Sequence, residues 1–210
     1  MANKKCFEIG CDISHWNGIV DFEKLKAQGL QFVIIKAGGS DKGFYKDPKF
    51  EDNYRLAKLA GMKVGAYYFV GKDFVSQEDG IQDAKRFLNF LRGKDFDYPV
   101  CVDIERTSPK DKEGATDAAI CFCNYLEDYR FYVSIYASDV SGFQERLQVE
   151  RLDPFDKWVA RYGTAKPSTP CGIWQYSSKG IFAGVNGYLD LDKSYLDYAA
   201  IMKKQQLNRG

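Results

Sequence analysis

A chain of 210 residues is long enough for one domain with a sizeable core, and single barrels often reach this length. Its 30 Lys and Arg against 29 Asp and Glu leave a net charge of +1, which gives no field to attract nucleic acid. The longest apolar runs, FVII and AYYFV among them, are too short to span a membrane, and no apolar stretch follows the basic start MANKKCFEIG. We therefore predict one domain over residues 1–210, made in the cytosol without a signal peptide, that neither binds nucleic acid nor inserts into a membrane.

Short apolar runs alternate with amphipathic segments along most of the chain, a pattern typical of parallel strands joined by helices. Strands are predicted at 7–14, 32–37, 63–70, 98–106 and 131–138, and helices at 21–29, 47–61, 76–93 and 112–129. After a helix or loop over 138–153, three strand-like runs follow at 157–163, 171–178 and 187–194, with little room for helices between them. The core is expected over about 7–200, and the last residues, 203–210, are expected to fray.

This order predicts an α/β fold, namely an irregular, TIM-like β/α barrel whose C-terminal strands are poor in helices; a doubly wound open sheet is the alternative. Barrel enzymes place their chemistry at the C-terminal ends of strands. Asp12 ends the first predicted strand, and Asp103 and Glu105 end the fourth. Asp190 and Asp192 lie near the end of the last strand, which a closed barrel places beside the first. The barrel therefore predicts a cleft at one rim, lined by these acids.

Carboxylates without a phosphate loop or metal-ligand spacing favour glycoside hydrolysis, in which one acid protonates the leaving oxygen. Like charges in a partly apolar cleft raise one pKa and leave the neighbour ionised. Glu105 has the longer reach and is the better proton donor of the Asp103 and Glu105 pair. From spacing alone the alternative is equally open, that both acids form ion pairs with Arg106, Lys36 or Arg161.

The remaining reactive residues offer little chemistry. None of the six cysteines is spaced C-x-x-C, and His15 is the only histidine, so we expect no metal site. The cysteines are interpreted as free thiols packed as small hydrophobes, which fits a reducing compartment. His15 is interpreted as a hydrogen-bonded structural residue. The chain lacks G-x-S-x-G, so serine-type acyl transfer is not expected.

Seven stretches, in chain order, resemble glycoside hydrolase family 25, the muramidases of bacteria and phages also called Chalaropsis-type lysozymes. They are GCDISHWNG, FVIIKA, VGAYYF, YPVCVDIE, WVARYG, IWQYSS and GVNGYLDLDKSY, from about residue 8 to 198. The resemblance implies hydrolysis of the β-1,4 bond between N-acetylmuramic acid and N-acetylglucosamine of peptidoglycan strands. It also implies an irregular β/α barrel that works without a cofactor.

The resemblance also implies site residues. The family's general acid falls on Glu105 and its D-x-E aspartate on Asp103, while its N-terminal and C-terminal acids fall on Asp12 and Asp190. Asp192 stands where the family usually has Asn, and we prefer Asp190 as the acid that faces the cleft. Two outcomes stay open: retention, in which the substrate's own 2-acetamido group attacks while Asp103 orients it, or inversion by an activated water.

Sugar contacts are expected from aromatic residues at strand ends, because flat rings stack on sugar faces. The candidates are Tyr67, Tyr136, Trp174 and Tyr176, with Lys36 as a weaker one. Core packing is the alternative for each motif.

One loop departs from the family pattern. After FVIIKA the chain reads GGSDKG where the family commonly has Thr-Glu-Gly, so the loop bordering the cleft is expected to bind glycan or stem peptide differently. The preferred setting is a phage endolysin that reaches the cell wall through a holin-made lesion, with a bacterial autolysin second. The rival functions are a non-catalytic wall-binding barrel and a hydrolase of chitin-like polymers.

Overall fold

The computed structural model describes residues 6–209. The strands are β1 (Glu8–Ile13), β2 (Phe32–Gly39), β3 (Tyr45–Lys46), β4 (Lys63–Phe69), β5 (Val100–Asp103), β6 (Val133–Ser138), β7 (Asp156–Ala160), β8 (Ile173–Gly180) and β9 (Leu189–Ser194). The α-helices are α1 (Phe22–Ala27), α2 (Phe50–Leu59), α3 (Gln77–Leu91), α4 (Lys112–Asp128) and α5 (Tyr198–Gln205). The short helices are η1 (His15–Asn17), η2 (Pro109–Asp111), η3 (Asp139–Gln144) and η4 (Val149–Leu152), of which η3 is a π-helix.

The strands form one closed ring. Their order is β1-β9-β8-β7-β6-β5-β4-β2, and β1 also pairs with β2, so the sheet has no open side; β3 continues beyond β2 as a hairpin arm. Gly10 to Ile13 of β1 lie opposite Phe32 to Ile35 of β2. The prediction of a barrel is therefore confirmed, and the open doubly wound sheet is excluded.

One barrel strand runs against the others. The pairs from β1 through β2, β4, β5, β6 and β7 to β8 are parallel, whereas β9 is antiparallel to both β8 and β1. The placement of Asp190 and Asp192 near the end of a last strand parallel to the rest was therefore wrong. Because β9 is reversed, its beginning lies at the rim with the carboxyl ends of the other strands, and Asp190 lies opposite Asp12.

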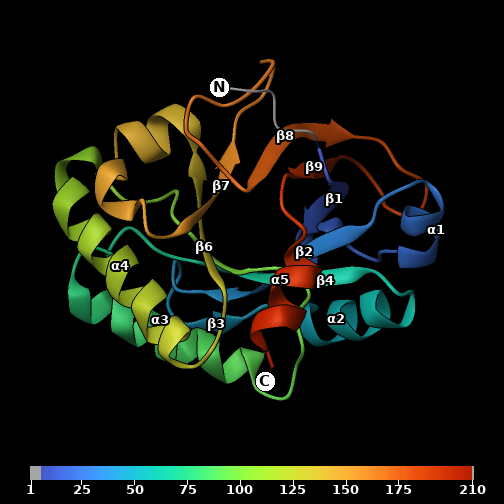
Figure 1. Ribbon diagram of the computed structural model, residues 1–210, viewed down its shortest axis with the longest axis horizontal. Coiled ribbons are helices and arrows are strands. Elements are labelled where there is room, and N and C mark those ends of the chain that lie inside the picture. The colour runs from blue at the N-terminus through green and yellow to red at the C-terminus, as the bar shows by residue number, and fades with distance from the viewer. Residues whose placement is uncertain (1–5, 210) are drawn as a thin grey trace.

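Helices cover only the first half of the barrel, as the sequence predicted. α3 and α4 lie side by side outside the sheet (Figure 1). They approach closely at Gly80, where an added Cβ would meet the carbonyl oxygen of Ala118 at 2.1 Å. Ser76 caps α3 by accepting from the amide of Asp79. After β6 the described chain has only η3 and η4 before β8, and no helix within residues 6–209 has the length and apolar character to cross a membrane.

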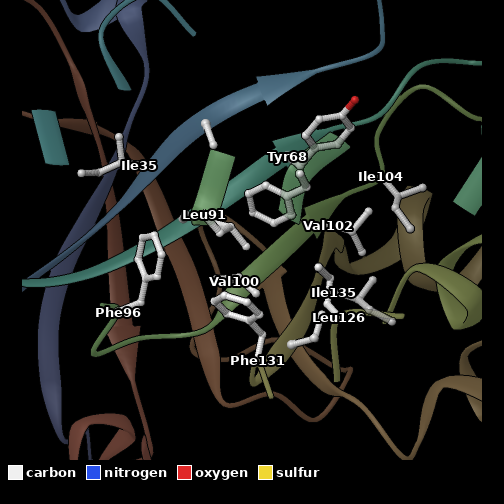
Figure 2. Packing of buried hydrophobic residues seen from close by; sticks show 14 of the residues in the cluster. Ile35, Tyr68, Leu91, Phe96, Val100, Val102, Ile104, Leu126, Phe131 and Ile135 are labelled. Carbon is white, nitrogen blue, oxygen red and sulfur yellow. The ribbon is translucent and has the colours of Figure 1, made fainter. Parts of the chain in front are cut away.

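The alternation of each strand divides the apolar core into two layers. The outer layer lies between sheet and helices, where Val100, Val102 and Ile135 meet Leu91 of α3 and Leu126 of α4 (Figure 2). The inner layer fills the barrel with Phe32, Ile34, Tyr67, Cys101, Tyr136, Trp158, Ala160 and Ile173. The barrel interior is therefore packed below the rim.

The C-terminal segment is ordered against the barrel, so the prediction of a frayed tail over 203–210 is wrong for its described part. Tyr198 and Met202 of α5 are buried in the inner layer. Asn208 is 0% exposed; its side-chain nitrogen donates to the carbonyl of Tyr98 at 2.8 Å, and its side-chain oxygen accepts from the amide of Tyr132 at 2.7 Å. These hydrogen bonds connect the end of the chain to the starts of β5 and β6.

Replacing Asn208 with Ala should lower the free energy of unfolding by about 2 kcal/mol, because it leaves two backbone groups without partners. The positive φ of 59° at this position adds strain for any residue with a Cβ except Asn or Asp. Urea denaturation measures the change, with Lys204→Ala on the exposed face of α5 as control. Equal midpoints for both variants would show that the tail does not stabilise the barrel.

Candidate active site

A cleft of about 940 Å³ opens at the rim where the carboxyl ends of the parallel strands meet the beginning of β9. Seven of the predicted site residues line it: Asp12, Lys36, Tyr67, Asp103, Glu105, Tyr136 and Asp190. Their strands are far apart in the sequence, and the closed barrel brings them together. The remaining predicted contacts, Trp174 and Tyr176, are not part of the lining.

The two acids of the D-x-E motif occupy different environments. Asp103 ends β5 and is buried, whereas Glu105 follows the strand and is exposed at the rim. The sequence analysis placed both acids within one strand, 98–106, but β5 ends at Asp103, before Glu105. Glu105 is therefore free to reach a ligand in the cleft, and Asp103 lies deeper.

Burial raises the pKa of Asp103 well above its ordinary value, and the charge of Glu105 raises it further. The ammonium of Lys36 acts in the opposite direction. Among residues 6–209, neither acid forms an ion pair, and Arg161 lies instead 4.0 Å from Asp139. The alternative of a purely ion-paired strand end is therefore not what the structure shows. Asp103 Oδ1 is also buried without a hydrogen-bond partner among the described residues.

Asp12 is held by a side chain that the sequence did not single out. The amide nitrogen of Gln175 donates to Asp12 Oδ2 at 2.7 Å. The amide oxygen of Gln175 accepts from the hydroxyls of Tyr136 at 2.9 Å and Tyr162 at 2.5 Å. Gln175 of β8 thus connects β1, β6 and the loop after β7 through one network of hydrogen bonds. Strand alternation separates Gln175 from its aromatic neighbours in IWQYSS, but the sequence alone did not show which face of the strand points inward.

Asp192 lies beneath this network, fully buried and outside the cleft lining. The indole nitrogen of Trp158 donates to Asp192 Oδ1 at 2.7 Å, and burial raises the pKa of Asp192 to about 8. The charge of Asp192 also raises the pKa of Asp12, so the pair favours a proton on one of its two carboxyl groups. Asp190, not Asp192, lines the cleft, as we preferred from the sequence.

The pKa values of the other two acids are raised as well. For Asp12 the main cause is burial, followed by the charges of Asp192 and Asp190. For Asp190 it is burial, followed by the charge of Glu105. Repulsion among these carboxylates therefore favours their protonated forms. A carboxylic acid that is still protonated near neutral pH can donate its proton.

Trp174 and Tyr176 lie on the other side of β8, so the prediction that they line the sugar site is wrong. The Trp174 indole donates to the carbonyl of Arg161 at 2.8 Å, and its ring centroid is 5.9 Å from that of Tyr176. The ammonium of Lys193 lies over both rings. Gln175 faces inward, so its neighbour Trp174 must face outward.

Other aromatic rings line the cleft in their place, namely Trp16, Tyr45, Phe69, Trp158 and Tyr162. Trp16 is 79% exposed, and its ring lies 4.6 Å from that of His15. Trp158 is buried and forms part of the floor. The cleft therefore offers exposed rings at its edge and polar groups at its centre, an arrangement suited to a sugar chain.

His15 is a hydrogen-bonded residue, as the sequence analysis proposed. Its Nδ1 lies 2.7 Å from Asp47 Oδ2, and its backbone amide donates to the same oxygen at 3.1 Å. These bonds attach η1 to the segment before α2. The ring also borders the cleft.

The GGSDKG segment forms the end of β2 and the turn into β3, and it does border the cleft. Asp41 and Lys42 are both in the lining, and Asp41 Oδ1 accepts from the hydroxyl of Tyr45 at 2.8 Å. The residues that depart from the family pattern therefore lie within reach of a bound glycan.

Comparison with known proteins agrees with this site. The family model for Glycosyl hydrolases family 25 matches residues 11–185. The autolytic lysozyme of Clostridium acetobutylicum is 29% identical over 186 residues, which cover 88% of this chain and 55% of that protein. Lysozyme M1 of Streptomyces globisporus is 29% identical over 210 residues, with 88% of this chain and 66% of that protein covered. The CTP1L endolysin structure is 29% identical with a TM-score of 0.82, over 94% of this chain and 70% of that one.

The chain spans about half to two thirds of the length of the curated relatives it matches. The family match begins in β1 and ends beyond β8, so it includes most of the barrel together with Asp12, Asp103 and Glu105. On this match, the chain belongs to glycosyl hydrolase family 25.

Proposed function

We propose that this chain is a muramidase, which hydrolyses the β-1,4 bond between N-acetylmuramic acid and N-acetylglucosamine in bacterial peptidoglycan. The observation that carries the proposal is the convergence of Asp12, Asp103, Glu105 and Asp190 on one open cleft. The names of its relatives, an autolytic lysozyme, a lysozyme and an endolysin, point to the same substrate.

Glu105 is the proposed general acid. It is exposed at the rim, and no ion pair holds it among residues 6–209, so its carboxyl group can approach the oxygen between two sugars. It would give its proton to that oxygen as the bond to the anomeric carbon breaks. The same group, then ionised, would take a proton from the water that completes hydrolysis.

Asp103 is proposed to orient the substrate's 2-acetamido group, whose oxygen attacks the anomeric carbon and gives retention. To balance the positive charge that the acetamido group gains on attack, Asp103 must be ionised, although its burial disfavours that form. The ammonium of Lys36 lowers the pKa of Asp103 and so favours the form that the reaction needs. This gives Lys36 an electrostatic role in addition to sugar contact.

Asp12 and Asp190 are proposed to stabilise, in their ionised forms, the positive charge that develops on the sugar ring, although burial and neighbouring charges raise the pKa of both acids. Gln175 fixes the orientation of Asp12 through its 2.7 Å hydrogen bond. Tyr67 and Tyr136 remain the proposed sugar contacts among the residues named from the sequence. No part of this scheme calls for a metal or an organic cofactor.

The test is mass spectrometry of fragments released from purified peptidoglycan, after borohydride reduction to mark the new reducing sugar. A muramidase leaves muramic acid at the reducing end. Reducing-end glucosamine would instead identify a glucosaminidase. Faster hydrolysis of chitin than of peptidoglycan would favour a chitin-like substrate, and no fragments from either polymer would favour a wall-binding barrel.

Two of the relatives are named an autolytic lysozyme and an endolysin, names given to enzymes that act on cell walls. We propose that this chain also acts on the bacterial cell wall. Release through a holin-made lesion stays a prediction. Lysis of cells that express the chain only when a holin is co-expressed would support that route over export as an autolysin.

A further inference from the structure

The charges around the cleft are unevenly distributed. Asp12, Asp103 and Asp190 come from β1, β5 and β9. Cationic side chains gather where β2, its turn into β3 and the loop after β5 meet, beside Asp41 on that turn and Glu105 on that loop. We call this group, Lys36, Lys42 and Arg106, the cation corner. Lys46 also borders the cleft there, but its ammonium is 2.5 Å from Glu51 and is already paired.

Phe69 lies between two of these cations. The ammonium of Lys36 is 4.3 Å from the centre of the Phe69 ring, and the guanidinium carbon of Arg106 is 5.8 Å from the same centre. Within residues 6–209, neither cation forms an ion pair or a hydrogen bond. Two like charges beside one ring repel each other, so the corner favours an anion that neutralises both.

Lys36 has the strongest need for a partner. Its side chain is only 8% exposed, and burial lowers its pKa. Its other near neighbours are the rings of Tyr45 and Tyr67, with centres 5.6 and 5.9 Å away. Aromatic faces attract an ammonium but accept none of its three hydrogen bonds in full. Within residues 6–209 the Lys36 ammonium has no hydrogen-bond acceptor, although the charges of Asp103, Asp41, Asp47 and Glu105 favour its protonated form.

Arg106 and Lys42 extend the corner to the surface. Both are exposed, and neither has an acidic partner in the described chain. The nearest acid on the turn, Asp41, accepts from the hydroxyl of Tyr45 at 2.8 Å. All three cations line the same cleft, with the buried ammonium near its floor side chains and the exposed cations at its surface.

Resting on the proposed function, we propose that Lys36, Lys42 and Arg106 bind a carboxylate carried by the substrate's muramyl residue. The muramyl sugar carries a lactyl group, which is either a free carboxylate or is amide-linked to a stem peptide that has carboxylates of its own. A chitin chain has neither. The cation corner would then distinguish peptidoglycan from chitin, because Arg and Lys form strong charge-assisted bonds to carboxylates.

The test compares kcat/KM on three soluble glycans: strands with stem peptides, strands stripped of peptide that keep the lactyl carboxylate, and stripped strands whose lactyl carboxylate is converted to a neutral methylamide. The protein should lose about ten-fold or more on the neutral strands, from one lost charge-assisted contact. Preference for peptide-bearing strands would identify the stem peptide as the source of the carboxylate. Preference for stripped strands with a free carboxylate would identify the lactyl group.

Arg106→Gln and Lys42→Gln should reduce this discrimination towards one, whereas Lys203→Gln, the same charge change on α5 at the other end of the barrel, should keep it. Equal kcat/KM on charged and neutral strands, or full discrimination in both corner variants, would overturn the proposal. Release of reducing-end muramic acid from all three glycans would show that the muramidase function stands even if the corner fails.

Discussion

Glu105→Gln should reduce turnover of peptidoglycan by about 10² to 10⁴-fold, the usual contribution of a general acid. The amide keeps the size and much of the hydrogen-bonding ability of the side chain but cannot supply a proton. Because Glu105 is exposed and forms no ion pair within residues 6–209, the barrel should remain folded. Dye release from labelled walls measures the rate, and thermal unfolding checks the fold.

Glu150→Gln is the matched control, since Glu150 is also exposed but lies outside the cleft lining. It should keep the wild-type rate. A Glu105→Gln protein with the same rate as this control would contradict the assignment of the acid.

Asp192→Asn should make the protein more stable at alkaline pH, by about 3 to 5 kcal/mol at pH 9. The pKa of Asp192 is raised to about 8 by burial, whereas an unfolded Asp titrates near 3.9. The folded state therefore holds a proton that the unfolded state loses, and this contribution to stability falls as the pH rises from about 4 to about 8. An Asn side chain does not ionise in this range, so the variant does not lose this stability as the pH rises.

The substitution also preserves the local contacts. The Asn oxygen can accept from the Trp158 indole as Asp192 Oδ1 does. Urea denaturation at pH 5 and pH 9 measures the effect, which should grow between the two. A constant difference, or a variant less stable at pH 9, would show that folding does not raise the pKa of Asp192.

Strand alternation explains which parts of the site the sequence could predict. Asp12, Lys36, Tyr67, Asp103 and Tyr136 lie on inward-facing positions close to strand ends, where a barrel exposes its side chains. Each strand was recognised by its own residues, so the placement of these side chains at the rim followed from local pattern and barrel closure together.

The direction of β9 was not inferred, although the chain contained a signal. The segment 181–188 between β8 and β9 is too short for the crossover of about a dozen residues that parallel strands need. It therefore implied a hairpin and a reversed strand. Asp190 reached the rim because of this reversal.

The wrong prediction that Trp174 and Tyr176 contact the sugar also came from strand alternation, because the inward face of the strand was not known. A large aromatic residue can face a helix layer or a ligand, and only the register of β8 against β9, where Gln175 lies opposite Asp192, shows which face is inward. α5 was missed for a different reason, since its buried Tyr198 and Met202 are four residues apart in a short, otherwise polar segment. The Asp197 cap was its clearest local sign.

The central claim, that Glu105 gives the proton to the leaving oxygen, is tested most directly by varying the leaving group. Aryl glycosides of an N-acetylglucosamine–N-acetylmuramic acid disaccharide would be compared in wild type and Glu105→Gln, with the first-turnover release of phenol as the measured rate. Dinitrophenol leaves without protonation, so the variant should stay within about ten-fold of wild type on it while losing about 10² to 10⁴-fold on unsubstituted phenol. An equal loss on both leaving groups would contradict the role assigned to Glu105.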